Sequence, residues 1–134
     1  MDVKKFSIKT NKRFELVDIT SRVLQIVSRS EVEEGVVVVF CRHTTAGITI
    51  NENADPAVQS DMLWKLKSLI PPAESEYQHA EGNSDSHLKS SIVGVSETII
   101  IDEGRLLLGT WQGIYFAEFD GPRSREVLVK VIAG

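Results

Sequence analysis

The sequence predicts an α+β domain, in which an antiparallel β-sandwich or sheet carries one main helix and one or two short helices. Three observations support this class. Runs of β-branched and apolar residues recur along the chain, short turn signals separate the later runs, and residues 56–70 have a strong helical start, helical spacing and a clear stop. With 134 residues, 42% apolar and 25% charged, the chain fits one domain over residues 1–134.

The first third of the chain predicts a hairpin, a short helix and two strands. Residues 3–19 alternate loosely between apolar and polar positions around Asn11 and Lys12, which indicates a hairpin. Thr20 can cap a helix over residues 21–29, although a strand is also compatible with that segment. Residues 36–42 are nearly all apolar, as in a strand buried on both faces, and residues 47–51 form the next strand.

The main helix over residues 56–70 has the clearest boundaries. Asp55 can cap the free backbone N–H groups, and Pro56 fits the first turn, where no donor is needed. Four apolar residues recur at helical spacing: Val58, Met62, Leu66 and Leu69. Pro71 and Pro72 end the helix.

The second half contains a long polar segment and then mostly strands. Residues 71–86 lack periodicity and are long for a connection in a compact domain, so we expect them to be functional or disordered. A short apolar patch over residues 88–93 indicates a brief helix that Asp85 or Ser86 starts. Turn sequences then separate four predicted strands: residues 97–101, 105–108, 113–119 and 126–132.

Charge, hydropathy and cysteine content exclude several classes. The net charge of -4 argues against nucleic-acid binding, which needs a basic face. The apolar runs are far shorter than a membrane span, residues 1–5 show no signal segment, and the single Cys41 cannot form an internal disulfide or a zinc site of several thiolates. We therefore expect a cytoplasmic protein. A small anionic ligand stays possible, because cations lie in or near motif-like segments: Arg42, Lys89, Arg105, Arg123 and Arg125.

The three histidines all lie in polar surroundings. His43 follows the apolar strand, and His79 and His87 border or lie in the polar segment. Three neutral imidazoles can occupy three corners of a tetrahedral zinc site and leave the fourth for water or substrate. Their spacing matches no standard zinc signature, so three solvated or hydrogen-bonded histidines are the alternative interpretation.

Other residue types near the histidines also allow chemistry. Four acids could orient imidazoles, or bind magnesium together with a substrate diphosphate: Glu52, Asp55, Glu81 and Asp85. Asp55 has capping as its simpler role, whereas Glu52 has no local task. Cys41 and His43 share a strand face, so a thiolate–imidazole nucleophile is conceivable, but a cysteine in an apolar run is usually buried and inert.

Two turns carry further candidates. Glycines bracket Trp111 and Gln112, so Trp111 could stack on a flat heterocycle while Gln112 bonds its edge. Alternatively, Trp111 fills the end of the sandwich. Arg123 follows turn residues and is available for a phosphate or a neighbouring subunit.

Several motifs together resemble a known family. They are residues 43–45, 51–56, 79, 87–89, 104–113 and 118–123. In this order they look like the YjbQ-like family, also called the secondary thiamine-phosphate synthase family, and the resemblance runs from about Asp18 to the C-terminus. It implies a small α+β sandwich that assembles as a homotrimer, with the polar motifs near subunit boundaries. Many relatives carry a histidine where this chain has Asp85, which would put a carboxylate into the metal ligand set.

The resemblance also implies a weak activity that joins a hydroxymethylpyrimidine diphosphate to a thiazole phosphate. Such a reaction needs the departing diphosphate neutralised and the two rings held in line, but no obligatory base. The candidate roles follow: catalytic His43, Glu52, Arg105 and Arg123; substrate-binding Asn51, Lys89, Trp111 and Gln112; metal-binding His43, His79 and His87. Zinc is the expected metal, and magnesium would accompany the diphosphate.

Two rival functions stay open at this stage. A zinc-dependent hydrolase would generate hydroxide on a histidine-bound ion, with Glu52 or Glu81 as base. A small-ligand-binding trimer without catalysis would need only the pocket. Product analysis separates the three functions.

Overall fold

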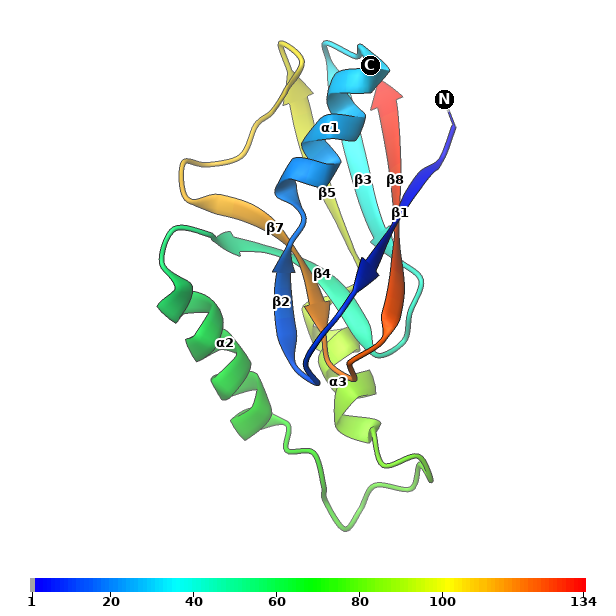
Figure 1. Cartoon of the computed structure of the whole chain (residues 1–134), viewed down its shortest axis with the longest axis vertical. Helices are drawn as coiled ribbons and strands as arrows, with labels where there is room; N and C mark the ends of the chain where they lie inside the picture. The colour runs from blue at the N-terminus through cyan, green and yellow to red at the C-terminus, as the bar shows by residue number, and fades with distance from the viewer. Residues whose placement is uncertain (1) are drawn as a thin grey trace.

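The computed structural model describes residues 2–134, and within that range it contains two antiparallel sheets and three helices (Figure 1). The larger sheet has the strand order β1-β8-β3-β5-β6, and the smaller sheet has the order β2-β7-β4. The strands are β1 Lys4–Lys9, β2 Glu15–Asp18, β3 Gly35–Cys41, β4 Ala46–Glu52, β5 Ser96–Asp102, β6 Arg105–Leu106, β7 Gln112–Glu118 and β8 Ser124–Ala133. The helices are α1 Thr20–Ser30, α2 Pro56–Leu69 and α3 Ser84–Val93. The predicted α+β class is confirmed.

The core lies between the inner faces of the two sheets and α1. Strand β3 lies between β5 and β8, and its residues Val37 and Val39 are fully buried. In the smaller sheet, β7 pairs with strands on both sides and buries Phe116. Helix α1 covers this interior with Val23 and Val27. Each such side chain stabilises the fold by about 1.5–3 kcal/mol relative to full exposure.

The outer face of β3 differs from the prediction. The sequence predicted a strand buried on both faces, but only Val37, Val39 and Cys41 are buried, whereas Val36 and Val38 are half-buried and Phe40 is 38% exposed. Strand side chains alternate between faces, and no described element covers the outer face of this sheet. The larger sheet therefore presents apolar side chains at its surface.

The predicted hairpin over residues 3–19 is wrong. β1 pairs with β8, with Lys4 opposite Val129, while β2 pairs with β7 in the other sheet, with Glu15 opposite Glu118. The connection between β1 and β2 is anchored to the end of β7, because the Thr10 hydroxyl donates to Glu118 at 2.7 Å. Alternation shows which face of a strand is buried but does not identify its partner, and here the two strands separate into different sheets.

The three helices lie where the sequence predicts them, but the predicted first turn is confirmed only for α2. Asp55 accepts from the Ala57 N–H at 2.9 Å, so the predicted cap of α2 is confirmed. For α1, Asp18 binds the Thr20 N–H and hydroxyl, while Thr20 is the first helical residue and not the cap. Helix α3 begins at Ser84, one or two residues before the predicted start at Asp85 or Ser86, and Asn83 at its N-cap position makes no side-chain cap hydrogen bond.

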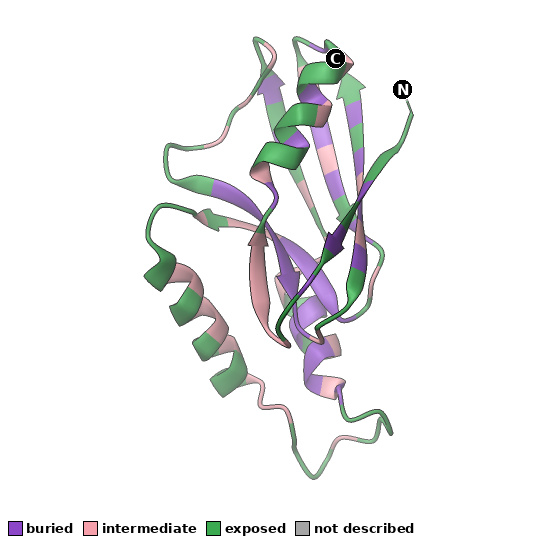
Figure 2. Ribbon diagram, viewed as in Figure 1, coloured by how far each residue is buried: buried purple, intermediate pink, exposed green. Residues whose placement is uncertain are grey.

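The other observed elements differ little from the predicted ones. The predicted strand over residues 105–108 is reduced to β6, which has only two residues. The segment between α2 and α3 has turns but no regular element (Figure 1), and the Tyr77 hydroxyl donates to the Pro71 carbonyl at 3.0 Å. Figure 2 shows that α3 buries part of its surface, whereas α2 has no buried residue. No helix among residues 2–134 is both long and apolar enough to cross a membrane.

Candidate functional site

The three histidines line one polar cavity of about 420 Å³, which we call the histidine pocket. It lies where the β3–β4 loop, the segment that leads into α3 and the β7–β8 turn meet. Its lining residues are Arg42, His43, Thr44, Thr45, His79, Glu81, Asn83, His87, Asp120, Arg123 and Arg125. The structure thus brings together His43, His79, His87 and Arg123 from positions as far apart as 80 residues in sequence.

Helix α3 is fixed against the sheets by two serine hydroxyls, and this fixes the position of His87. Ser86 donates to the carbonyl of Phe119 at 2.5 Å, and Ser90 donates to the carbonyl of Ala46 at 2.6 Å. The rings of His79 and His87 lie 5.3 Å apart and nearly perpendicular. One wall of the pocket therefore consists of two adjacent imidazoles: His87 lies on a helix that is tied to the ends of β7 and β4, and His79 lies in the segment that leads into this helix.

His43 is held by the opposite wall. Its Nε2 atom accepts from the backbone N–H of Glu126 at 3.0 Å, and its ring packs edge-on against Phe116 with centroids 6.5 Å apart. Burial lowers the pKa of His43, and the nearby positive charge of Arg125 lowers the pKa further. His43 is therefore neutral near pH 7.

The arginines of the pocket are all paired with carboxylates. The pairs are Arg42 with Glu126 at 2.7 Å, Arg123 with Asp120 at 3.0 Å and Arg125 with Glu118 at 2.5 Å. Glu81 adds a further negative charge beside His79, at 3.9 Å. The pocket consequently has no surplus of positive charge, and a bound anion would need a cation of its own or neutral hydrogen-bond donors.

The predicted zinc ligands do not fit a zinc site in this arrangement. In the described part of the chain, no group of three histidine, cysteine, aspartate or glutamate side chains is arranged to hold a metal ion. Nε2 of His43 is occupied by the Glu126 N–H, so its lone pair does not face a metal. Asp85 is fully buried and bonded to Lys89 at 2.6 Å and Arg13 at 3.0 Å, so it does not supply a carboxylate to the pocket.

Several predicted site residues lie at the far ends of the sheets. Asn51 and Glu52 end β4, and they pair with Gly113 and Gln112 at the start of β7. At about 3.3 Å per residue, they are about 20 Å along the strand from its His43 end. Arg105 is similarly distant, because it lies beyond the end of β5 that is opposite the pocket. Within one subunit, these residues form no common site with the histidines.

The side chains at that far end have local roles or are exposed. Gln112 accepts from the Gly109 N–H at 2.8 Å and so closes its own turn. Asn51 accepts from the Glu52 N–H at 2.7 Å. Trp111 is 62% exposed, so it does not fill the end of the sandwich. Lys89 is only 1% exposed in its pair with Asp85 and is therefore not free for a ligand.

The fold and the motifs of the pocket can be compared with those of known proteins. A sequence model of the family described as "UPF0047 protein YjbQ-like" matches residues 4–134. The chain belongs to this YjbQ-like family. The UPF0047 protein MJ1081 of Methanocaldococcus jannaschii is 60% identical over 128 residues, which cover 96% of this chain and 92% of that protein. YugU of Bacillus subtilis is 49% identical, with coverage of 97% and 98%.

Solved structures of YjbQ-like proteins share the fold. One from Clostridium acetobutylicum has a TM-score of 0.95 at 54% identity and covers 96% of this chain and 99% of its own. Another, from Sulfolobus solfataricus, is described as a protein of unknown function; it has a TM-score of 0.95 at 34% identity, with coverage of 99% and 97%. The YjbQ-like fold therefore persists at one-third identity.

The residues that sequence reasoning missed are the buried polar supports of the pocket. Glu118 is fully buried and receives hydrogen bonds from Arg125, Thr10 and the Asp120 N–H. Arg125 in turn donates to the Thr45 hydroxyl at 2.9 Å, and Asn83 donates to Asp120 at 2.8 Å. The available signal was a glutamate at the end of an otherwise apolar strand, opposite an arginine across a turn.

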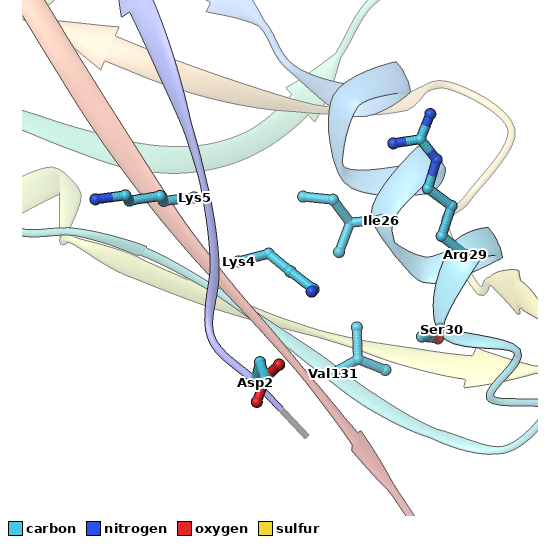
Figure 3. Close-up of a pocket in the computed structure, with 7 residues that line it drawn as sticks. All are labelled: Asp2, Lys4, Lys5, Ile26, Arg29, Ser30 and Val131. Atoms are coloured by element: carbon cyan, nitrogen blue, oxygen red, sulfur yellow. The ribbon is translucent and has the colours of Figure 1, made fainter.

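A second cavity, of about 560 Å³, lies between β1, β8 and α1 (Figure 3). Ile26 and Val131 form apolar walls, and Lys4 and Arg29 lie at its edge. In Figure 3 the guanidinium of Arg29 points away from Lys4, so the two cations do not converge. None of the three histidines lines this cavity, and the histidine pocket is therefore the stronger candidate site despite its smaller volume.

The environment of His43 predicts a pH dependence of stability. In NMR titration, His43 should have a midpoint below about 6.5, the ordinary histidine value. The unfolded chain then binds more protons than the native state in this range, so the free energy of unfolding should fall as the pH decreases from 7 through the folded pKa. The slope should be smaller for His43→Gln. Equal slopes for the two proteins would contradict the prediction.

Proposed function

We propose that the histidine pocket binds the diphosphate of a small phosphorylated heterocycle, and that the chain joins hydroxymethylpyrimidine diphosphate to thiazole phosphate to give thiamine phosphate and pyrophosphate. The observation that carries the proposal is the convergence of three imidazoles and Arg123 around one cavity of about 420 Å³. This volume lies in the usual range for small-molecule sites. The resemblance of the motifs supports the choice of substrates.

The reaction breaks the bond between the pyrimidine methylene carbon and the diphosphate oxygen, and it forms a bond from the thiazole nitrogen to that carbon. Pyrophosphate leaves with the electron pair, and no proton has to be removed. The enzyme therefore needs to stabilise the leaving diphosphate and align the rings. Arg123 is suited to the first task because its side chain is half exposed and its partner Asp120 fixes it at the pocket.

The charge of the pocket bears on how the diphosphate would arrive. Since each pocket arginine already has a carboxylate partner, a bare diphosphate would meet little net positive charge. A magnesium diphosphate carries less negative charge and suits such a pocket better. We therefore propose that the substrate binds as its magnesium complex.

The test mixes the purified protein, both half-molecules and magnesium, and quantifies thiamine phosphate. We expect product that disappears when magnesium is removed with EDTA and that is strongly reduced in His43→Ala. Equal product from the wild type and His43→Ala would indicate a contaminating synthase or another site. Hydrolysed pyrimidine without coupled product would instead favour the hydrolase.

We also propose that the chain assembles as a homotrimer. Strand β7 does not supply the interface, since it buries its apolar side chains within the subunit. The outer face of the larger sheet offers another surface, with Phe40 38%, Ile132 44% and Ile100 59% exposed. Register places Val36 between Ile100 and Ile132, so these side chains form one patch. Such a patch is typical of a subunit interface.

In a trimer, the residues that lie about 20 Å from the histidines of their own subunit could belong to the site of a neighbouring subunit. Trp111 of one copy would have to approach the histidine pocket of a neighbouring copy for both to contact one substrate. Light scattering should return about three times the chain mass of 14.9 kDa. Ile100→Glu should shift the mass towards the monomer, whereas Ser60→Glu, at an exposed position of α2 away from this sheet, serves as the control for added charge. A monomeric wild type would remove the proposed assembly.

A further inference from the structure

We propose that His43 acts in the histidine pocket as a neutral hydrogen-bond donor through its Nδ1–H group, and that it is neither a metal ligand nor a general base. The donor limits the class of ligand, because a group that faces it must present a hydrogen-bond acceptor, such as a phosphoryl oxygen. Only the identity of that ligand rests on the proposed function.

The hydrogen bond at Nε2 fixes the tautomer. A backbone N–H can only donate, so Nε2 of His43 must use its lone pair to accept from Glu126 at 3.0 Å. The remaining proton of a neutral imidazole then resides on Nδ1. Pairing between β3 and β8 ends at Cys41 and Val127. The imidazole binds the N–H of Glu126, the residue of β8 that directly precedes Val127 in sequence. The ring thus continues the sheet edge, which makes this hydrogen bond part of the fold.

Protonation of the ring would disrupt this arrangement. An imidazolium would place an Nε2–H against the Glu126 N–H, and two donors cannot bond to each other. The edge contact with Phe116 removes water from one side of the ring, and the guanidinium of Arg125 repels a second positive charge. The carboxylates of Glu118 and Glu126 and the backbone hydrogen bond with Glu126 raise the pKa of His43, but burial and the charge of Arg125 outweigh them and the pKa is lowered.

The fixed tautomer limits what His43 can do. A base must have a free lone pair, but Nε2 is occupied and Nδ1 carries a proton. Coordination of zinc through Nδ1 would require loss of that proton, which is far more difficult than binding through a free nitrogen. Donation to an anionic oxygen requires no change. A neutral donor also suits a pocket whose arginines are already paired, since it contributes a hydrogen bond without adding charge.

The first experiment needs no ligand and so does not depend on the proposed function. Long-range ¹⁵N–¹H NMR of the uniformly labelled full chain at pH 7, with the His43 signals assigned by their loss in His43→Asn, reports which nitrogen is protonated. We expect a protonated Nδ1 and an unprotonated Nε2. The reverse tautomer, or a ring protonated on both nitrogens, would overturn the inference. Addition of zinc alone should leave both His43 signals in place, and zinc-dependent loss of the Nδ1 proton would also overturn it.

The second experiment tests donation, with magnesium pyrophosphate as the probe. Binding should shift the Nδ1–H signal of His43. Asparagine can place an amide N–H near the position of Nδ1, so His43→Asn should bind within a few-fold of the wild type, whereas His43→Ala should bind about ten-fold more weakly, as for one lost charge-assisted hydrogen bond. Equal losses in the two variants would contradict donation by Nδ1. If the wild type does not bind the probe, donation to a phosphoryl oxygen and the proposed function both fail, while the tautomer is still decided by the first experiment.

Discussion

Glu118→Gln should lower the free energy of unfolding by about 3–5 kcal/mol, the range for breaking a buried ion pair by removing one charge. Glu118 is fully buried, and it binds Arg125 through both carboxylate oxygens, at 2.8 and 2.5 Å. Glutamine keeps nearly the same shape but leaves the guanidinium of Arg125 buried without a counter-charge. Burial alone would raise the pKa of Glu118, but the hydrogen bonds from Arg125, the Asp120 N–H and Thr10 outweigh burial and lower the pKa.

Urea denaturation followed by circular dichroism measures this effect. Glu103→Gln is the matched control, because Glu103 is 78% exposed and lies 3.9 Å from an equally exposed Arg105. Exposed pairs contribute little, so this variant should unfold close to the wild type. Equal unfolding midpoints for Glu118→Gln and Glu103→Gln would contradict the assigned importance of the buried pair.

Arg123→Ala should lower the rate of thiamine phosphate formation by about ten- to a thousand-fold, as expected when one electrostatic partner of a transition state is lost. The side chain of Arg123 is 50% exposed and is bonded to Asp120 through the carbonyl at 2.8 Å and the carboxylate at 3.0 Å. It is therefore positioned but still accessible to a leaving diphosphate.

The control for this effect is Arg29→Ala, which removes an exposed arginine at the other cavity. It should retain the wild-type rate, and thermal unfolding should show that both variants are folded. Arg123→Lys keeps the charge but loses the planar fork, so its rate should lie between those of Arg123→Ala and the wild type. A full rate in Arg123→Ala would place the chemistry outside the histidine pocket.

The local elements could be predicted from sequence where one short signal determines them. Asp55 followed by Pro56 starts a helix through a cap formed by residues adjacent in sequence, and β-branched runs form strands. Pairing between strands depends on partners that are remote in sequence, and so β1 and β2 were wrongly paired with each other. The outer face of β3 could not be predicted either, since apolar residues on a strand do not show whether another subunit or an element of the same chain covers them.

In the candidate site, the distance between two residues in the fold does not follow their spacing in sequence. The histidines are far apart in sequence, yet they line one pocket. By contrast, His43 and Glu52 are nine positions apart and lie at opposite ends of β4, because an extended strand of seven residues carries its ends about 20 Å apart. The tautomer of His43 was also beyond sequence reasoning, since it depends on a backbone N–H 83 positions away.

The position of β8 also determines the order in which the fold can form. Strand β8 lies between β1 and β3, and it pairs Lys4 with Val129. During synthesis, β1 therefore has no neighbour in the larger sheet until residues 124–129 have left the ribosome, whereas β3 and β5 can pair earlier. Sheet closure over such a long loop is slow, and the nascent chain has to keep an unpaired edge and an apolar face exposed until then. Ribosome-bound chains that end before residue 124 should consequently depend on chaperones, and those that extend well beyond β8 should not.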